Sequence, residues 1–329
     1  MRKWLLIAIA ACGPNNQLTF EEYAAQAPGA YCAYFTRCGL FPDQATCEHT
    51  QLGIRFTADP NAAAAIGSGK ISFDGGAAGA CLAAISGLAC NAALVSTTPP
   101  ACFGVATGTV GSGGTCASND ECISQKCDVP SCPDACCQGT CVGGTAPVPG
   151  ATGMPCGIGE TTPACVDGDF CNFQTGSCAP FIAEGSACMD TEQCAPGLGC
   201  VGTPLTCKQL PDTGAACPDH ACANIGEHCG SAGTCVKDGL PGDTCTINSD
   251  CSPFFPCDST GHCATGPGLG QPCPMDRCFD VGTYCTSETG SAMPTCVAAG
   301  SDGAPCTQND QCVSNTCTGS ACMTPAACF

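Results

Sequence analysis

The hydrophobic pattern divides the chain into a helical N-terminal third and a long remainder in which apolar residues are sparse. At the start of the first part, the order Thr19-Phe-Glu-Glu22 fits a capping box, in which Thr19 and Glu22 each satisfy a backbone N–H of the other. Further on, four residues from Cys81 to Leu88 form one apolar stripe at helical spacing. This pattern predicts a small helical bundle.

Two more helix starts and six cysteines belong to the same region. Asp43 and Asp74 stand where an N-cap residue is expected, and they predict helices that carry Cys47 and Cys81. Six cysteines can close three disulfides, and their pairing stays open at this stage. The six are Cys32, Cys38, Cys47, Cys81, Cys90 and Cys102.

Beyond residue 115 the helical periodicity gives way to a repeat. Seven repeat units each start with a glycine three residues before the first cysteine, and these starts are spaced 28 to 40 residues apart, which indicates a tandem array. Within the units, the second cysteine often follows an Asp, Asn or Glu turn. The fourth often follows a glycine by two residues, as at Gly139, Gly176, Gly233 and Gly261, which predicts the positive φ of a tight hairpin. The units start at Cys116, Cys156, Cys188, Cys217, Cys245, Cys273 and Cys306.

Each unit is therefore expected to be a short two-stranded hairpin with loops, held by two disulfides. Four cysteines allow three pairings, and spacing alone does not choose among them. The first unit has seven cysteines and the last has five, so either disulfides cross unit boundaries or two thiols are free. The two most regular units contain Cys188, Cys194, Cys200 and Cys207, and Cys245, Cys251, Cys257 and Cys263.

The composition agrees with a fold held together by disulfides. Cysteine makes up 39 of 329 residues, above the roughly 8–10% that marks a disulfide scaffold. Leu, Ile, Val and Phe together number 49, about 15%, which is too few for the long buried strands of a barrel or a doubly wound enzyme. We predict a small disulfide-rich fold: a helical domain stapled by disulfides, followed by a tandem array of short, two-stranded, loop-rich modules.

The cysteines also indicate an oxidising compartment, because cytosolic reductants would keep so many thiols free. A cytosolic metal-cluster protein is the alternative, but it needs Cys-x-x-Cys pairs and the chain has none. The formal charge of −19 repels phosphate backbones, so nucleic acid is not expected as a partner. No cofactor-binding motif in a suitable context is present.

The N-terminus predicts export. A basic start is followed by an apolar run that is too short to span a bilayer. Ile9-Ala10-Ala11-Cys12 resembles the lipobox of bacterial lipoproteins, which implies cleavage before Cys12 and a lipid anchor on its sulfur. Gly13 in place of an Asp retention signal implies the outer membrane and the cell surface. The alternative is an ordinary secretory signal and a secreted protein.

These observations divide the chain into five expected segments. They are a signal peptide over 1–11, a lipidated cysteine and tether over 12–18, a helical six-cysteine domain over 19–104, a Gly/Ser/Thr-rich hinge over 105–115 and seven repeats over 116–329.

The chain resembles a family of cysteine-rich surface lipoproteins of myxobacteria and their relatives, whose repeats are likened to the Dickkopf N-terminal module. The resemblance rests on the Gly-x-x-Cys starts, the Asp-x-Cys turns and two motifs of the helical domain, around Phe73-Asp74 and Ala101-Cys102. By analogy with EGF-like modules, the resemblance implies disulfides from the first to the third and from the second to the fourth cysteine. It implies no catalytic residue.

Two groups of residues suggest metal chemistry, and each has a simpler explanation. His220 and His228 lie among three cysteines and could complete a zinc site, but those cysteines occupy ordinary repeat positions. The Asp and Asn turns could bind calcium weakly, although each offers few carboxylates and turn capping explains them.

The expected function is that of a non-enzymatic surface protein, a structural or adhesive array that binds a protein or glycan ligand. Seven units placed end to end would project about 100 Å. A protease inhibitor is the alternative, since small disulfide domains display rigid loops. An enzyme is the least favoured class, because few histidines and no reactive-thiol motif are present.

Overall fold

The structure is a computed structural model. It describes residues 17–50, 60–90, 99–102, 104–130, 138–145, 150–156, 165, 168–172, 174–273, 278–286, 294–314 and 316–323. The expected signal peptide and the lipidation site Cys12 lie outside these residues. Within them, no helix has the length and apolar character needed to cross a bilayer.

The N-terminal part is a helical unit whose caps match the sequence prediction. The Thr19 hydroxyl accepts from the Glu22 N–H at 3.1 Å, and the Glu22 carboxylate accepts from the Thr19 N–H at 2.8 Å. Asp43 and Asp74 also cap the helices that follow them. The elements are α1 (Phe20–Arg37), α2 (Gln44–Glu48), α3 (Pro60–Gly67), β1 (Ile71–Phe73), α4 (Gly75–Ser86), η3 (Pro100–Cys102) and β2 (Ala106–Gly108).

Small side chains let the two long helices lie close together. Ala27 and Ala30 of α1 pack in one buried cluster with Ala78, Leu82 and Ile85 of α4. Because alanines bury little area, this core contributes modest hydrophobic stabilisation. Three disulfides supplement it, and they join Cys32 to Cys47, Cys38 to Cys90 and Cys81 to Cys102.

The segment predicted as a hinge is structured, and that prediction is wrong. Residues 106–108 form β2, which pairs antiparallel with β1 of the helical unit, and Val105 is buried in the same cluster as α1 and α4. Gly108 is there for close contact, because a Cβ at this position would lie 2.4 Å from the carbonyl oxygen of Cys122. Gly108 therefore reflects close packing against the first repeat unit, whereas a Cβ at Gly111 or Gly113 would meet no atom within 4 Å.

Seven modules follow, and we number them 1 to 7 along the chain. Most contain one two-stranded antiparallel sheet, module 1 contains three strands, and module 5 has isolated bridges. The modules span residues 116–141, 156–178, 188–207, 217–235, 245–263, 273–296 and 306–322. Their strands are β3 (Thr115–Cys116), β4 (Cys127–Asp128), β5 (Gly139–Cys141), β6 (Asp169–Asn172), β7 (Ser177–Pro180), β8 (Leu198–Val201), β9 (Thr206–Gln209), β10 (Glu227–Cys229), β11 (Cys235–Lys237), β12 (Thr283–Cys285), β13 (Cys296–Ala298), β14 (Cys317–Thr318) and β15 (Ala321–Cys322). Single 3₁₀ turns are η4 (Asn119–Glu121), η5 (Thr191–Gln193), η6 (Asn248–Asp250) and η7 (Asn309–Gln311).

The disulfides of every module follow one interlaced scheme. The first cysteine pairs with the third, and the second pairs with the last, as the resemblance to EGF-like modules implies. The 34 cysteines among the described residues form 17 disulfides, so none of these 34 is a free thiol. In the two most regular modules the pairs are Cys188–Cys200, Cys194–Cys207, Cys245–Cys257 and Cys251–Cys263.

The glycine three residues before each first cysteine closes the module onto its last cysteine. In all seven modules this leading glycine has a positive φ. Its N–H donates to the carbonyl oxygen of the last cysteine at 2.7–2.8 Å. Only glycine adopts such a backbone conformation without strain, which explains the Gly-x-x-Cys signature. The leading glycines are Gly113, Gly153, Gly185, Gly214, Gly242, Gly270 and Gly303.

The glycine two residues before the last cysteine has a less uniform role than predicted. Gly176, Gly233 and Gly261 have the expected positive φ. Gly139 instead lies within β5, where a Cβ would come within 2.8 Å of the Cys127 sulfur and 2.6 Å of a backbone oxygen. At Gly139 the prediction of a positive-φ turn is therefore wrong, and close packing against the disulfide requires the glycine.

A pair of glycine substitutions tests the role of the leading glycine. Gly214→Ala is expected to destabilise the protein by about 1 kcal/mol, because an L-residue is strained at its φ of 80°. Gly79→Ala is the control, because Gly79 lies inside α4, where a methyl group would meet no neighbouring atom within 4 Å, and alanine favours helix. Thermal unfolding of the two oxidised variants should shift in opposite directions. A fall in both would contradict this explanation.

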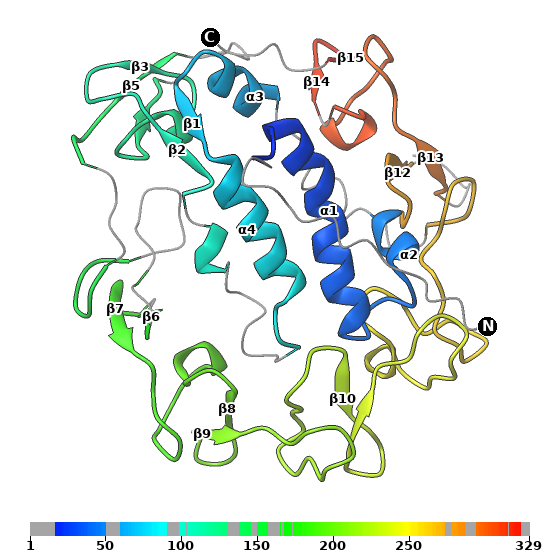
Figure 1. The fold of residues 1–329 in the computed structure, drawn as a ribbon. Coiled ribbons are helices and arrows are strands. Elements are labelled where there is room, and N and C mark those ends of the chain that lie inside the picture. The colour runs from blue at the N-terminus through cyan, green and yellow to red at the C-terminus, as the bar shows by residue number, and fades with distance from the viewer. Residues whose placement is uncertain are drawn as a thin grey trace, which may run out of the picture.

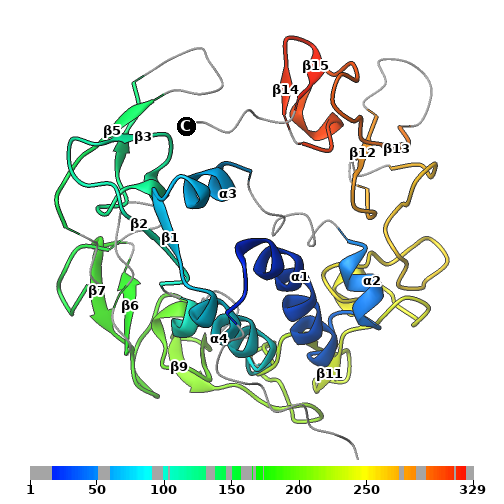
Figure 2. The same ribbon diagram turned by 45° about the horizontal axis from the view of Figure 1, so that its top comes forward.

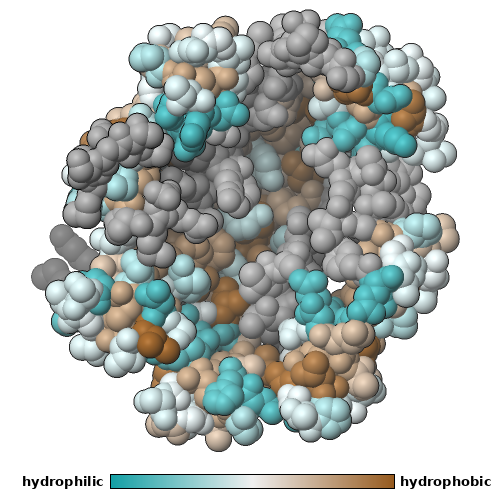
Figure 3. Space-filling view, turned by 180° about the vertical axis from the view of Figure 1, so that it is seen from behind, coloured by the Kyte–Doolittle hydropathy of each residue, from teal (hydrophilic) through white to brown (hydrophobic). Residues whose placement is uncertain are grey.

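The modules curve around the helical unit, so the expected extended array is wrong. Figures 1 and 2 show the modules following one another along an arc, with α1 and α4 on its inner side. Figure 3 shows the rear face hollowed in the middle, with apolar surface inside the hollow.

Specific bonds hold the arc to the helices. Ser252 of module 5 donates its hydroxyl to the Leu40 carbonyl oxygen at 2.8 Å. The Ile225 N–H of module 4 donates to the Cys90 carbonyl oxygen at 2.9 Å, and Val281 of module 6 donates to His49 at 2.9 Å. At module 1, Glu121 forms a 3.0 Å salt bridge with Lys70. Modules 1, 4, 5 and 6 are thus each bonded directly to the helical unit.

Candidate ligand pocket

A cavity lies where modules 4, 5 and 6 meet the helical unit. Its volume is about 720 Å³, within the range of small-molecule sites. Phe254, Phe255 and Phe279 form its apolar side, and Glu227, His228 and Asp238 form its polar side. We call this cavity the phenylalanine pocket.

The apolar side is built by the loop between the second and third cysteines of module 5. This loop reads Ser-Pro-Phe-Phe-Pro over residues 252–256, and the Phe255 N–H closes a turn by donating to the Ser252 carbonyl oxygen at 2.8 Å. The disulfides of Cys251 and Cys257 anchor both ends of the loop. The two phenylalanines are therefore displayed on a short, covalently fixed segment.

A buried aromatic residue of the helical unit supports these side chains from behind. The Phe41 ring stacks on Phe254 with 4.6 Å between centroids, and it meets Phe255 edge to face at 5.5 Å. Phe255 in turn lies 5.7 Å from Phe279, a residue of module 6. Phe41 and Phe255 are only 1% and 2% exposed. The pocket wall is therefore continuous with the core that joins module 5 to the helices.

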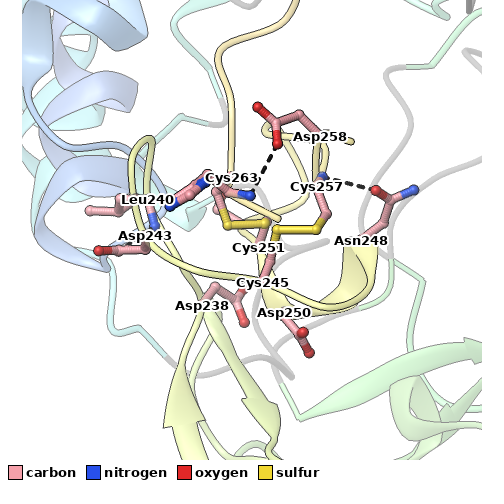
Figure 4. The surroundings of a disulfide bond; sticks show 12 residues. Asp238, Leu240, Asp243, Cys245, Asn248, Asp250, Cys251, Cys257, Asp258 and Cys263 are labelled. Carbon is pink, nitrogen blue, oxygen red and sulfur yellow. Dashed lines mark hydrogen bonds between the residues drawn. A yellow bond between two sulfur atoms is a disulfide. The ribbon is translucent and has the colours of Figure 1, made fainter. Parts of the chain in front are cut away.

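The polar side centres on an imidazole between two carboxylates. His228 Nδ1 lies 2.9 Å from Asp238 Oδ1, and its Nε2 lies 3.8 Å from Asp250 Oδ1. His228 comes from β10 of module 4 and Asp250 from η6 of module 5, so this contact crosses the boundary between the modules. Figure 4 shows Asp238 and Asp250 on the same side of the two disulfides of module 5.

The environments of the two aspartates shift their pKa values in opposite directions. Burial raises the pKa of Asp238, although the hydrogen bond and the charge of His228 oppose that shift. Hydrogen bonds from the Thr246 hydroxyl and from the backbone N–H groups of Thr246 and Ile247 hold the pKa of Asp250 below its usual value. Asp238 is thus a carboxylate in a poorly solvated place, whereas Asp250 serves as a local cap.

The zinc alternative lacks its sulfur ligands. Cys217 and Cys229 form one disulfide, and Cys222 forms another with Cys235, so none offers a thiolate. His228 is hydrogen-bonded to Asp238, and His220 lies in a turn with a positive φ of 58°. The other cysteine clusters of the modules have the same explanation, because their sulfur atoms are all in disulfides.

The Asn and Asp turns act as caps. Asn248 Oδ1 accepts from the Cys257 N–H at 2.9 Å, as Figure 4 shows, and Asn309 does the same for Cys317 at 2.8 Å. Asp250 accepts from the Thr246 N–H at 2.7 Å, and Gln311 occupies the matching position in module 7 with the same bond length to Thr307. Because an uncharged glutamine makes the same bonds, hydrogen bonding explains these positions without calcium.

Sequence reasoning placed His228 in a candidate site, but it missed the pocket. The signal available was Phe254-Phe255 between two prolines, an aromatic pair in an array with few aromatic residues. Its position opposite His228 depends on how the modules curve, which the repeat pattern does not encode.

Comparison of the chain with protein-family models, curated proteins and solved structures finds no significant match.

Proposed function

We propose that this protein is a non-enzymatic, ligand-binding protein of the cell surface, anchored through a lipid on Cys12. The extensive disulfides indicate an extracellular or secreted protein. The observation that carries the binding role is the phenylalanine pocket, a cavity whose aromatic loop, residues 252–256, is fixed by a disulfide at each end. Walls that are ordered before binding lower the entropic cost of capturing a ligand.

The anchor and the binding role are tested separately. Cells expressing the full chain with radiolabelled palmitate should incorporate label into the protein, and Cys12→Ser should abolish it. Release of unlabelled protein into the medium would overturn the anchor.

For the binding role, the neutral apolar dye Nile red is titrated into the oxidised protein and its fluorescence is recorded. A saturable one-to-one increase is expected, and Phe254→Ala should weaken it about tenfold. Leu205→Ala is the control, because Leu205 is an exposed apolar residue of module 3 that does not line the pocket. Equal losses in the two variants, or no saturable signal, would overturn the binding role.

One observation favours protease inhibition as a second candidate. Several modules display an exposed apolar side chain within two residues of a disulfide: Met189 is 66% exposed, Val313 63% and Ile247 59%. Rigid loops of this kind fit protease clefts. Inhibition of a serine, cysteine or metalloprotease at micromolar protein, lost in Met189→Ala or Val313→Ala, would favour this candidate over the pocket.

A further inference from the structure

We propose that the phenylalanine pocket binds a small amphiphilic cation, namely an alkyl or aryl body that carries one ammonium group. This inference rests on the proposed function, because it names the class of ligand for the same pocket.

The apolar half of the pocket suits the body of such a ligand. Phe254 and Phe279 are partly exposed to the cavity, whereas Phe255 is almost fully buried beside them. Pro253 and Pro256 extend this surface and stiffen the loop. The surface is aromatic, and aromatic ring faces attract cations as well as apolar groups.

The polar half selects the sign of the ligand's charge. Glu227 and Asp238 both line the cavity, and no lysine or arginine is among the described residues that line it. The side chain of Asp238 is 9% exposed, and the His228 imidazole is its one ion-pair partner among the described residues. An ammonium group beside it would compensate a carboxylate that water reaches poorly. An anionic ligand would meet like charges there.

The surface next to the pocket is also acidic. A second cavity of about 390 Å³ shares Gly266 and Phe279 with the phenylalanine pocket and is lined by Asp280. The whole protein carries a formal charge of −19, which raises the local concentration of cations. The pocket and its surroundings therefore favour one charge sign.

Three probes of matched shape test the inference by isothermal titration calorimetry on the oxidised protein. They are 4-phenylbutyltrimethylammonium, the neutral 4-phenylbutanol and the anion 4-phenylbutyrate. The cation is expected to bind at least tenfold more tightly than the alcohol, and the anion is expected to bind more weakly than both. Equal affinities for cation and alcohol, or preference for the anion, would overturn the inference and leave the binding role intact.

Variants then locate the charge selectivity. Asp238→Asn keeps an oxygen for the His228 contact and should weaken the cation about tenfold while leaving the alcohol unchanged. Asp219→Asn is the matched control: it removes the same charge from module 4 at an exposed salt bridge with Lys208, and it should change neither. Equal effects of both variants would indicate that the overall negative charge of the protein attracts the cation, and would overturn the assignment to Asp238. If the folded protein binds none of the three probes, both the inference and the proposed binding role fail.

Discussion

Reduction of the oxidised protein with dithiothreitol is expected to unfold all seven modules. In modules 1, 3, 4, 6 and 7 the buried residues of the cluster are all cysteines: module 4 buries Cys217, Cys222 and Cys235, with Cys229 packed against them. Module 5 adds Phe255, which packs in one cluster with residues of the helical unit. Little apolar surface remains to hold a module once its bridges are cut. Each bridge closes a short loop and contributes roughly 3 kcal/mol, so the two bridges of a module outweigh its hydrophobic stabilisation.

Hydrogen exchange followed by mass spectrometry measures this unfolding. Peptides of modules 1 to 7 should lose protection on reduction, whereas the oxidised protein should protect the amides that bond to the last cysteine of each module. An unreduced sample treated with the same buffer is the control. Retention of protection in the reduced modules would contradict a disulfide-held fold.

The same samples decide how the remaining cysteines are used. The described disulfides number 17 and account for 34 cysteines. The other five cysteines lie outside the described residues, and apart from Cys12 they are Cys132, Cys136, Cys137 and Cys328. Three belong to the first repeat unit and one to the last, so if Cys12 carries the proposed lipid, an arrangement without free thiols requires a bridge between the two ends of the array. Two titratable thiols would establish the other alternative, and non-reducing peptide mapping distinguishes them.

Phe41→Ala is expected to destabilise the protein by about 3–5 kcal/mol, the usual cost of removing a buried phenylalanine. Phe41 belongs to the helical unit, but its ring contacts Phe254 and Phe255 of module 5. Its loss should therefore release module 5 from the helices while the disulfides of the module stay closed. Thermal unfolding and hydrogen exchange over residues 245–263 measure the two effects.

Phe170→Ala is the control for this substitution. Phe170 also stacks on another phenylalanine, Phe181, with 6.0 Å between centroids, but both are partly exposed and lie at module 2. Its replacement should cost less and should leave exchange in module 5 unchanged. If both variants behaved alike, Phe41 would have no special role in docking the module.

Local features of the fold could be predicted from the sequence. Capping at Thr19, Asp43 and Asp74 involves residues two or three positions apart, so short motifs specify it. The module boundaries follow from leading glycines that need a positive φ. These features depend on backbone sterics and nearby hydrogen bonds, which sequence patterns record directly.

The curvature of the array and the pocket could not be predicted in the same way. Ser252 and Leu40, which join module 5 to the helices, are 212 residues apart in sequence. The Gly-rich composition of 105–115 suggested a hinge, because close packing and flexibility both select glycine. The two causes can be distinguished only when the neighbour of the glycine in the folded protein is known, as with the Cys122 carbonyl oxygen beside Gly108.

The interlaced pairing has a consequence for a chain exposed to secreted proteases. Because the bridge from the first to the third cysteine overlaps the bridge from the second to the last, a single cut anywhere between the outer cysteines leaves both fragments covalently tied. Sequential pairing would release them after a cut in the middle. A nicked module can thus stay in place, and damage to one loop does not shed the rest of the array.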